Sequence, residues 1–565
     1  MAYYPEYLWI VILGFIFGFV YAFGIGANDV ANAFGSTVAS KSLTLKQAIV
    51  VAGIFEFLGA LLLGASVTST VRSGIFDPAI YEDEPDIVLL GQFSTIITGT
   101  LMLLTATYYG LPVSTTHTIV ASTMGFSIVA KGFSSINWNT VTNIFISWVI
   151  SPLVSGILAF LFFGSIKKFI FKHERTFERA YYTFPLILTI FIGIDVFYVI
   201  YKGFNNKDFT DDLNLAVVIP VSFGIGLLVG LFWIVWWGPR AKKRIIKREE
   251  EKLAKEGVKK SLKEKQNEVD DDGDAEVQKL DAQETTDPET TTTTDPDLEA
   301  SWCPDYSFQT QAKKADEVIE TTKKADEVIE TPEVVEPPEE EENPTPEEEE
   351  EEPKGFFKKK MRDIAAATYE QDLEEQALEE NKDAADIWAH AEVFDWKSEQ
   401  LFVYVQVFTA CLNSFAHGAN DVANAIAPLS SILMIYQTGE VDSKAPVEKW
   451  ILVYGGLGIV IGLALYGYKV MKSIGYKVTV LTPSRGSSAE LAASLFVVTA
   501  SFLGIPVSTT QSISGAIVGV GLVGGRHNVQ WWYFLRIVCG WVVIFFVSII
   551  LSAGIFSMFA FTPSL

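Results

Sequence analysis

The sequence contains about twelve apolar stretches of roughly 20 residues, which is the length of helix that spans a lipid bilayer. A soluble core seldom needs so many in series. They lie near residues 7–33, 46–66, 88–110, 112–130, 142–165, 183–203, 213–238, 400–435, 449–468, 488–505, 507–524 and 531–560. The sequence therefore predicts an all-α, polytopic membrane protein surrounded by the lipid bilayer.

Most of the charge is concentrated in one segment. The chain is 49% hydrophobic yet carries a net charge of −25, and residues 240–398 hold 48 acidic and 24 basic side chains, against 20 and 19 elsewhere. This segment is rich in Glu, Lys, Thr and Pro, so it cannot bury enough apolar surface to fold. We expect a largely disordered acidic loop with a short helical patch near 361–388. It is either a regulatory, partner-binding loop or a solvated linker, and we expect no nucleic-acid partner.

Four units follow from this pattern. Residues 1–165 and 399–565 are two repeats of a membrane domain, 166–239 are two linking transmembrane segments, and 240–398 are the acidic loop. Basic residues cluster after the fifth and seventh apolar segments, which places the loop in the cytoplasm and both termini outside. The connection after the second segment is acidic, whereas its counterpart in the second repeat is basic. We therefore expect the repeats to be inverted relative to each other.

The octapeptide GANDVANA occurs twice, at 26–33 and 418–425. Each copy places an aspartate inside an apolar segment, where a charge is costly and by default marks a functional site. The glycines Gly26 and Gly418 are expected to let the helix break and free backbone carbonyls. Amide, carboxylate and carbonyl oxygens would suit an alkali or alkaline-earth cation, although a helix-packing motif of small residues is the alternative. The candidate cation ligands are Asn28, Asp29, Asn32, Asn420, Asp421 and Asn424.

The pentapeptide PVSTT also occurs twice, at 112–116 and 506–510. Proline fits the first turn of a helix, and hydroxyl residues belong near its N-terminus. The flanking apolar segments are nearly contiguous, so we expect each copy at the tip of a re-entrant hairpin that lines a cavity. Such a helix start is an anion site, unless the hydroxyls bond back to their own helix. The candidate anion ligands are Ser114, Thr115, Thr116, Ser508, Thr509 and Thr510.

The candidate anion site has carboxylates rather than basic residues beside it. No Lys or Arg stands within or next to the four motifs, so an anion would be repelled unless cations occupied Asp29 and Asp421 first. If the motifs converge, this favours a symporter over a simple anion pore. Two further acids in or beside apolar segments, Glu56 and Glu490, have no acidic counterpart in the other repeat. They are candidate ligands of an additional cation site, or glutamates at the membrane interface.

The paired motifs, in two halves around a hydrophilic loop, resemble the inorganic phosphate transporter (PiT) family over both membrane blocks. The resemblance implies sodium- or proton-driven uptake of inorganic phosphate, a homodimer and an elevator-like movement of a transport domain. It also implies that the GANDVAN residues bind sodium ions and that the hairpin tips hold phosphate. Glu56 and Glu490 match positions that resemble functional glutamates of the family. The long loop is more similar to eukaryotic members, and we expect the plasma membrane as the location.

Other functions remain open from the residues alone. A proton-coupled carrier, a transporter of another oxyanion and a membrane phosphate sensor or receptor each fit part of the pattern. Two intact motif pairs argue against the receptor, which would not need both cation sites. The sequence contains no P-loop, nucleophile elbow or metal triad, so we expect no enzymatic activity. No cofactor is expected beyond sodium ions as co-substrate.

Overall fold

The computed structural model describes residues 4–203, 214–271, 387–388, 390–441 and 447–561. These residues are helical almost throughout, apart from an isolated β-bridge between Phe76 and Ile136. The helices of the first half are α1 (Leu8–Ile25), α2 (Ala31–Ala39), α3 (Leu45–Ser73), α4 (Pro85–Tyr108), α5 (Thr115–Lys131) and α6 (Trp138–Ile166). The linking helices are α7 (Thr176–Tyr198), α9 (Leu215–Phe232) and α10 (Gly238–Asp271). The second half holds α16 (Trp396–Thr438), α17 (Lys449–Tyr466), α18 (Tyr468–Lys477), α19 (Pro483–Leu503), α20 (Thr509–Val523) and α21 (Trp531–Ala560).

Each of the twelve expected membrane segments coincides with a helix. In the described part of the chain, nine helical stretches are long and apolar enough to cross a bilayer. Helices α5, α16 and α20 account for the remaining three segments. The prediction of an all-α, polytopic membrane protein is therefore confirmed.

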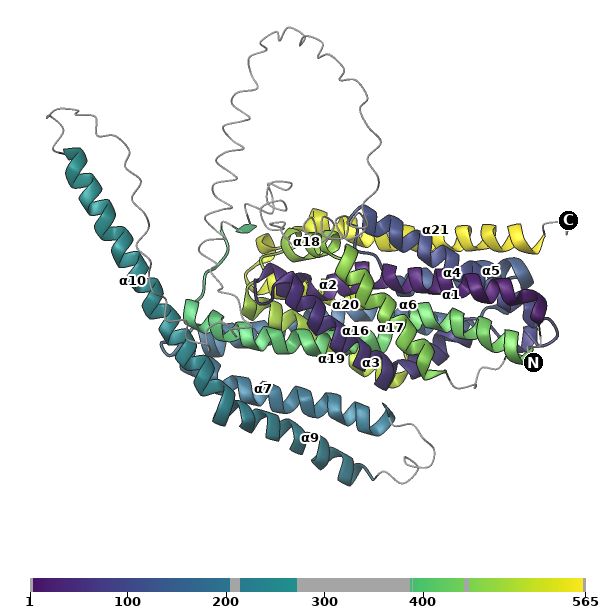
Figure 1. Ribbon diagram of the computed structural model, residues 1–565, viewed down its shortest axis with the longest axis horizontal. Helices are drawn as coiled ribbons and strands as arrows, with labels where there is room; N and C mark the ends of the chain where they lie inside the picture. The colour runs from purple at the N-terminus through teal and green to yellow at the C-terminus, as the bar shows by residue number, and fades with distance from the viewer. Residues whose placement is uncertain (1–3, 204–213, 272–386, 389, 442–446, 562–565) are drawn as a thin grey trace, which may run out of the picture.

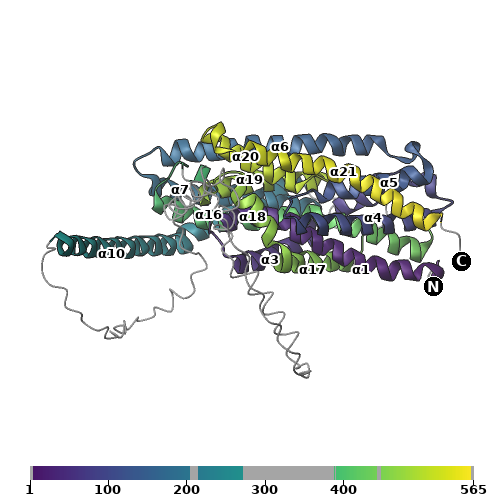
Figure 2. The same cartoon turned by 90° about the horizontal axis from the view of Figure 1, so that it is seen from above.

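The two repeats run in opposite directions through one bundle. The backbone N–H of Tyr4 donates to the carbonyl of Tyr436 at 3.4 Å, so the start of α1 lies beside the end of α16. Both described ends of the chain lie at one end of the bundle, and α10 leaves from the other (Figure 1). In Figure 2, α6 and α21 run along the same flank, and each packs on the short hairpin helix of the other repeat, α20 and α5 respectively. This is the inverted arrangement that the loop charges predict.

Both PVSTT copies form the turn of a helical hairpin. Gly110 and Gly504 end the first helix of each hairpin with φ of +62° and +72°, a conformation that glycine adopts without steric cost. The second helices then begin at Thr115 and Thr509, and the side chains of the preceding Ser114 and Ser508 accept the N–H of the residue three positions on. Pro112 and Pro506 therefore lie in the turn before the helix start rather than in its first turn.

The expected helix break at the GANDVANA motifs is wrong. The first copy contains a single π-helical turn, Gly26–Val30, and the second lies within the unbroken helix α16. A Cβ at Gly26 would stand 1.8 Å from the carbonyl oxygen of Ile459, and one at Gly418 would stand 2.1 Å from that of Glu56. The glycines therefore allow the close approach of α17 and α3 rather than unwinding. This supports, for these two positions, the packing role that the sequence left as an alternative.

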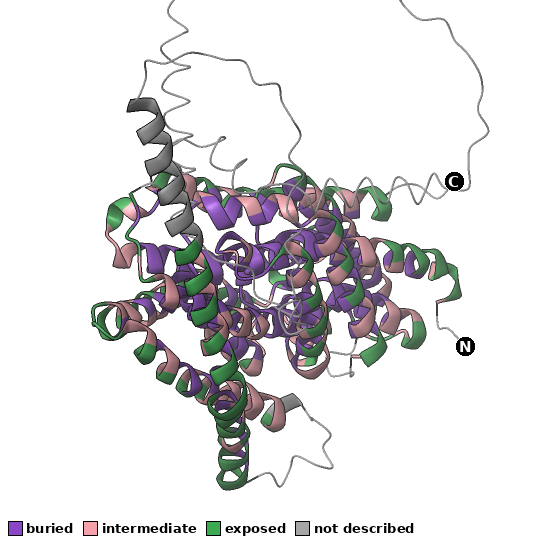
Figure 3. Cartoon of the chain, turned by 60° about the vertical axis from the view of Figure 1, so that its left-hand side comes forward, coloured by how far each residue is buried: buried purple, intermediate pink, exposed green. Residues whose placement is uncertain are grey.

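Two helices lie where the sequence predicted loops. The first 34 residues after η7 (Trp233–Trp237) form α10, in which Glu and Lys, both good helix formers, are frequent. Helix α18 is amphipathic, because Val470, Met471 and Ile474 are buried. Residues 272–386, which include most of the predicted disordered loop and its helical patch, lie outside the described residues. Buried residues fill the middle of the bundle, whereas much of the described surface of α10 is exposed (Figure 3).

Candidate functional site

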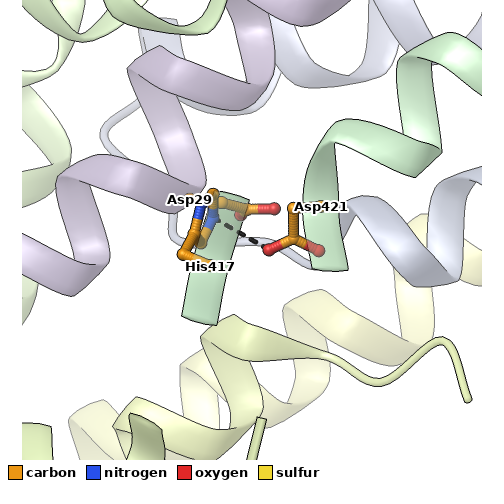
Figure 4. A group of neighbouring side chains, drawn as sticks. All are labelled: Asp29, His417 and Asp421. Carbon is orange, nitrogen blue, oxygen red and sulfur yellow. Dashed lines mark ion pairs between the residues drawn. The ribbon is translucent and has the colours of Figure 1, made fainter. Parts of the chain in front are cut away.

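The aspartates of the two GANDVANA copies meet in the core of the bundle. Asp29 comes from the π-helical turn and Asp421 from the middle of α16, and both are buried. With His417 they form a group whose ligand atoms all lie within 4.8 Å of one another (Figure 4). Because the helices that carry them are antiparallel, residues nearly 400 positions apart converge on one centre.

The hairpin tips reach the same centre. Thr115 Oγ1 donates to Asp29 Oδ2 at 2.5 Å, and Thr509 Oγ1 donates to Asp421 Oδ2. The tip of the second hairpin also contacts the first repeat, because Thr510 Oγ1 lies 2.8 Å from Asp29 Oδ1. The candidate anion and cation ligands are thus direct neighbours, as the coupling hypothesis requires.

Hydrogen bonds also connect each repeat to the other. Asn32 Nδ2 donates to Thr510 Oγ1 at 3.1 Å, and Asn424 Nδ2 donates to Thr115 Oγ1 at 3.0 Å. Thr116 Oγ1 donates to the carbonyl of Val507 at 2.9 Å, while Thr510 Oγ1 lies 3.1 Å from the carbonyl of Val113. The two carbonyl contacts are counterparts under exchange of the repeats, and the counterpart of the Asn32 bond is a longer one from Asn424 Nδ2 to Thr116 Oγ1 at 3.5 Å, so the two repeats contribute to the centre in similar but not identical ways.

Four of the predicted ligands hold the hairpins instead of pointing at the shared centre. Asn28 Nδ2 donates to the carbonyl of Leu111 at 2.9 Å, and its Oδ1 accepts the N–H of Val113 at 3.0 Å. Asn420 makes the equivalent pair of bonds to Ile505 and Val507. Ser114 and Ser508 cap their own helices. In this conformation these side chains fix the backbone of the two tips.

His417 was missed by the sequence reasoning, and it joins Glu56 to the centre. Its Nδ1 lies 2.8 Å from Glu56 Oε2, and its Nε2 lies 2.8 Å from Asp421 Oδ2. Glu56 also accepts from Ser414 Oγ at 3.1 Å. The residue directly precedes the second GANDVANA copy, where the first copy has Ile25. That difference between otherwise identical motifs was the available signal.

Glu490 occupies a polar cluster of its own. Its carboxylate accepts from Ser36 Oγ at 2.6 Å, Thr37 Oγ1 at 2.5 Å, Gln406 Nε2 at 3.0 Å and Thr409 Oγ1 at 2.6 Å. These donors come from α2 and α16, whereas Glu490 belongs to α19. Glu490 is fully buried, so in this structure its side chain does not reach the lipid headgroups or water, which favours the cation-site interpretation over the alternative of an interfacial glutamate. A buried carboxylate among hydroxyl oxygens offers the hard oxygen ligands that a second cation site would need.

The central site suits a small, hard cation in the present conformation. Three carboxylates, those of Asp29, Asp421 and Glu56, lie around one imidazole, so the group is negatively charged when the carboxylates are ionised, whether or not His417 is protonated. The cavity beside Asp29, His417 and Thr509 is only about 10 Å³, which is about the space of one water molecule. A tetrahedral oxyanion needs more room than this. In this conformation the centre therefore has no room for such an anion.

Known proteins resemble this chain over nearly its full length. The profile of the phosphate transporter family matches residues 25–552. The chain is 32% identical to "Sodium-dependent phosphate transporter 1-A" of Danio rerio, covering 98% of this chain and 95% of that protein. It is 29% identical to "Phosphate-repressible phosphate permease pho-4" of Neurospora crassa, covering 99% and 98%. A solved structure, "The sodium-dependent phosphate transporter", superposes with a TM-score of 0.66 at 25% identity, covering 98% of this chain and 99% of that one.

Proposed function

The chain belongs to the phosphate transporter family, and from this premise we propose that it carries inorganic phosphate across a membrane together with sodium ions. The observation that supports the proposal most directly is the convergence of Asp29 and Asp421 with the threonines of both hairpin tips. The role is transport rather than catalysis. Sodium ions act as co-substrate, with the aspartates as their ligands and the tip hydroxyls as ligands of phosphate.

The number of hydroxyl protons at the hairpin tips explains why phosphate binding would require bound sodium ions. A threonine hydroxyl has one proton to donate and two lone pairs that accept. As long as Thr115 donates to Asp29 and Thr509 donates to Asp421, neither proton is available to phosphate. A sodium ion on each carboxylate would compensate its charge and coordinate the hydroxyl oxygen. The O–H group can then turn to the phosphate, so sodium binds first and phosphate second.

Electrostatics lead to the same order. Phosphate entering an empty site would meet two carboxylates at short range, and unit charges a few ångströms apart repel strongly away from water. Cations bound at Asp29 and Asp421 reverse this repulsion into attraction. By thermodynamic linkage, bound phosphate must raise the affinity for sodium by the same factor.

The direct test is uptake of labelled phosphate into vesicles containing the purified full-length chain. We expect uptake to require a sodium gradient and to disappear when choline replaces sodium. Uptake that persists in choline and follows a proton gradient would instead favour the proton-coupled alternative. Stronger competition by sulfate or arsenate than by unlabelled phosphate would assign another oxyanion.

Location and assembly are further parts of the proposal. We infer a multi-pass protein of the plasma membrane with both termini outside and the acidic loop in the cytoplasm, because basic residues flank that loop. Tags at Met1, Thr292 and Leu565 should accordingly report outside, inside and outside. The family resemblance also supports a homodimer and an elevator-like movement of a transport domain.

A further inference from the structure

A basic groove lies where the linking helices leave the apolar part of the chain. Helix α9, the turn η7 and α10 form one continuous helical stretch. Val235, Trp236 and Trp237 are exposed and are followed within a few residues by Arg240, Lys242 and Lys243. Exposed tryptophans next to basic residues mark the boundary between hydrocarbon and water. Figure 1 places this boundary at the end of the bundle opposite the described ends of the chain.

The groove itself lies between the first turns of α7 and of α10. Its volume is about 740 Å³, and its lining includes Tyr181, Tyr182, Lys242, Lys243, Ile246 and Lys247. Lys242 Nζ stands 5.8 Å from the centre of the Tyr181 ring. None of the three lysines forms an ion pair with another residue in the described part of the chain. Glu250 is the one acidic side chain of the lining, so the groove carries a net positive charge.

The position of the groove is fixed by the opposite face of α10. Ala241 and Ile245 are buried in a cluster with residues of α7 and α16. Lys397 at the start of α16 forms an ion pair with Glu249 at 2.8 Å. The first turns of α10 are therefore held against the bundle, and Lys243, Ile246 and Lys247 are directed outward. This keeps the lysines at the membrane boundary.

We propose that this groove binds the anionic headgroup of a membrane phospholipid. The lysine ammonium groups pair with the headgroup phosphate, and the exposed side chains of Tyr182 and Ile246 contact its glycerol and upper acyl chain. A lipid fits better than a soluble anion, because the groove combines cations with exposed apolar side chains at the bilayer boundary. Each basic residue near an anionic surface strengthens binding about fivefold.

The test uses purified full-length protein titrated with phosphatidylserine or phosphatidylcholine and analysed by native mass spectrometry. The variant combines Lys242→Gln, Lys243→Gln and Lys247→Gln. The control combines Arg526→Gln with Arg536→Gln, two exposed basic residues of η8 (Arg526–Asn528) and α21 outside the groove. We expect the variant to lose about 100-fold in phosphatidylserine affinity and the control to bind as the unchanged protein does. Phosphatidylcholine should bind weakly to all three.

Three results would overturn the proposal. The first is unchanged phosphatidylserine affinity in the triple variant. The second is displacement of the lipid by inorganic phosphate, which would assign the groove to the free anion. The third is lipid binding that appears only after deletion of residues 336–352, of which 11 are glutamates, which would make that acidic segment the occupant. Sodium-dependent phosphate uptake by the triple variant in phosphatidylcholine vesicles would show that it is folded. If the triple variant does not fold, the single substitution Lys243→Gln tests the same proposal and should weaken phosphatidylserine binding about fivefold.

Discussion

Replacing Thr115 with valine removes one hydroxyl at the point where the two repeats meet. Its Oγ1 donates to Asp29 Oδ2 at 2.5 Å and accepts from Asn424 Nδ2 at 3.0 Å. In the proposed cycle the same O–H turns to phosphate after sodium has bound. Hydrogen bonds to charged groups contribute about 1.5–3 kcal/mol, so we expect Thr115→Val to lower phosphate affinity roughly 10- to 150-fold.

The assay compares two affinities in the reconstituted protein: phosphate at saturating sodium, and sodium without phosphate. Phosphate affinity should fall by the stated factor, and sodium affinity should change much less. Thr118→Val is the matched control, because the Thr118 hydroxyl is equally buried but donates to the carbonyl of Ser114 in its own helix at 3.1 Å. Thr115→Ser, which keeps the hydroxyl, should stay close to the unchanged protein.

Two outcomes would refute this reasoning. If Thr115→Val lost sodium affinity but kept phosphate affinity, the hairpin tips would be the cation site and the GANDVAN motifs would have another role. If Thr118→Val impaired phosphate binding as strongly as Thr115→Val, the effect would come from a destabilised α5 rather than from a lost ligand.

The remaining predictions concern packing, the cation site and the acidic loop. Gly26→Ala places a Cβ 1.8 Å from a carbonyl oxygen and should lower the free energy of unfolding by about 1–3 kcal/mol or more. Gly224→Ala, whose Cβ would meet nothing within 4 Å, should leave the free energy of unfolding nearly unchanged. Equal melting temperatures of the two variants would contradict the close helix contact. Asp421→Asn should abolish sodium-dependent phosphate uptake and weaken phosphate binding by linkage, and a variant with normal sodium dependence would remove Asp421 from the cation site. Deletion of residues 272–350 should preserve uptake in vesicles, because the duplicated motifs lie outside them, and loss of uptake by a correctly inserted protein would make the loop part of the transport machinery.

The positions of the membrane segments could be predicted because the bilayer imposes a simple rule on local sequence. A span needs roughly 20 apolar residues, and this requirement does not depend on what the segment packs against. Helix α16 departs furthest from that rule, since it runs on through polar residues such as Asn420 and Asp421. Its GANDVANA motif, identical to the first copy, still marked it as the counterpart of α1 and α2.

The helix break at Gly26 and Gly418 was predicted wrongly because glycine has two uses that look alike in sequence. It permits unusual backbone angles, and it lets another backbone come close. The choice depends on whether a neighbouring helix crosses at that residue, which a local pattern does not contain. Here Ile459 and Glu56 supply the crossing backbones.

The sequence by itself determined the membrane-spanning class, the duplication, the inversion of the repeats and the residue types of an ion site. Each of these rests on composition, repetition or loop charge, which are properties of the chain read in order. Only the tertiary structure decided that Asp29 and Asp421 share one centre. It also decided that Asn28 and Asn420 form hydrogen bonds with the backbone of the hairpins. The link from Glu56 to the site through His417 likewise appears only in the structure. These facts depend on which face of each helix meets which neighbour. The packing of helices that are far apart in sequence determines which faces meet, so no single stretch of sequence specifies these contacts.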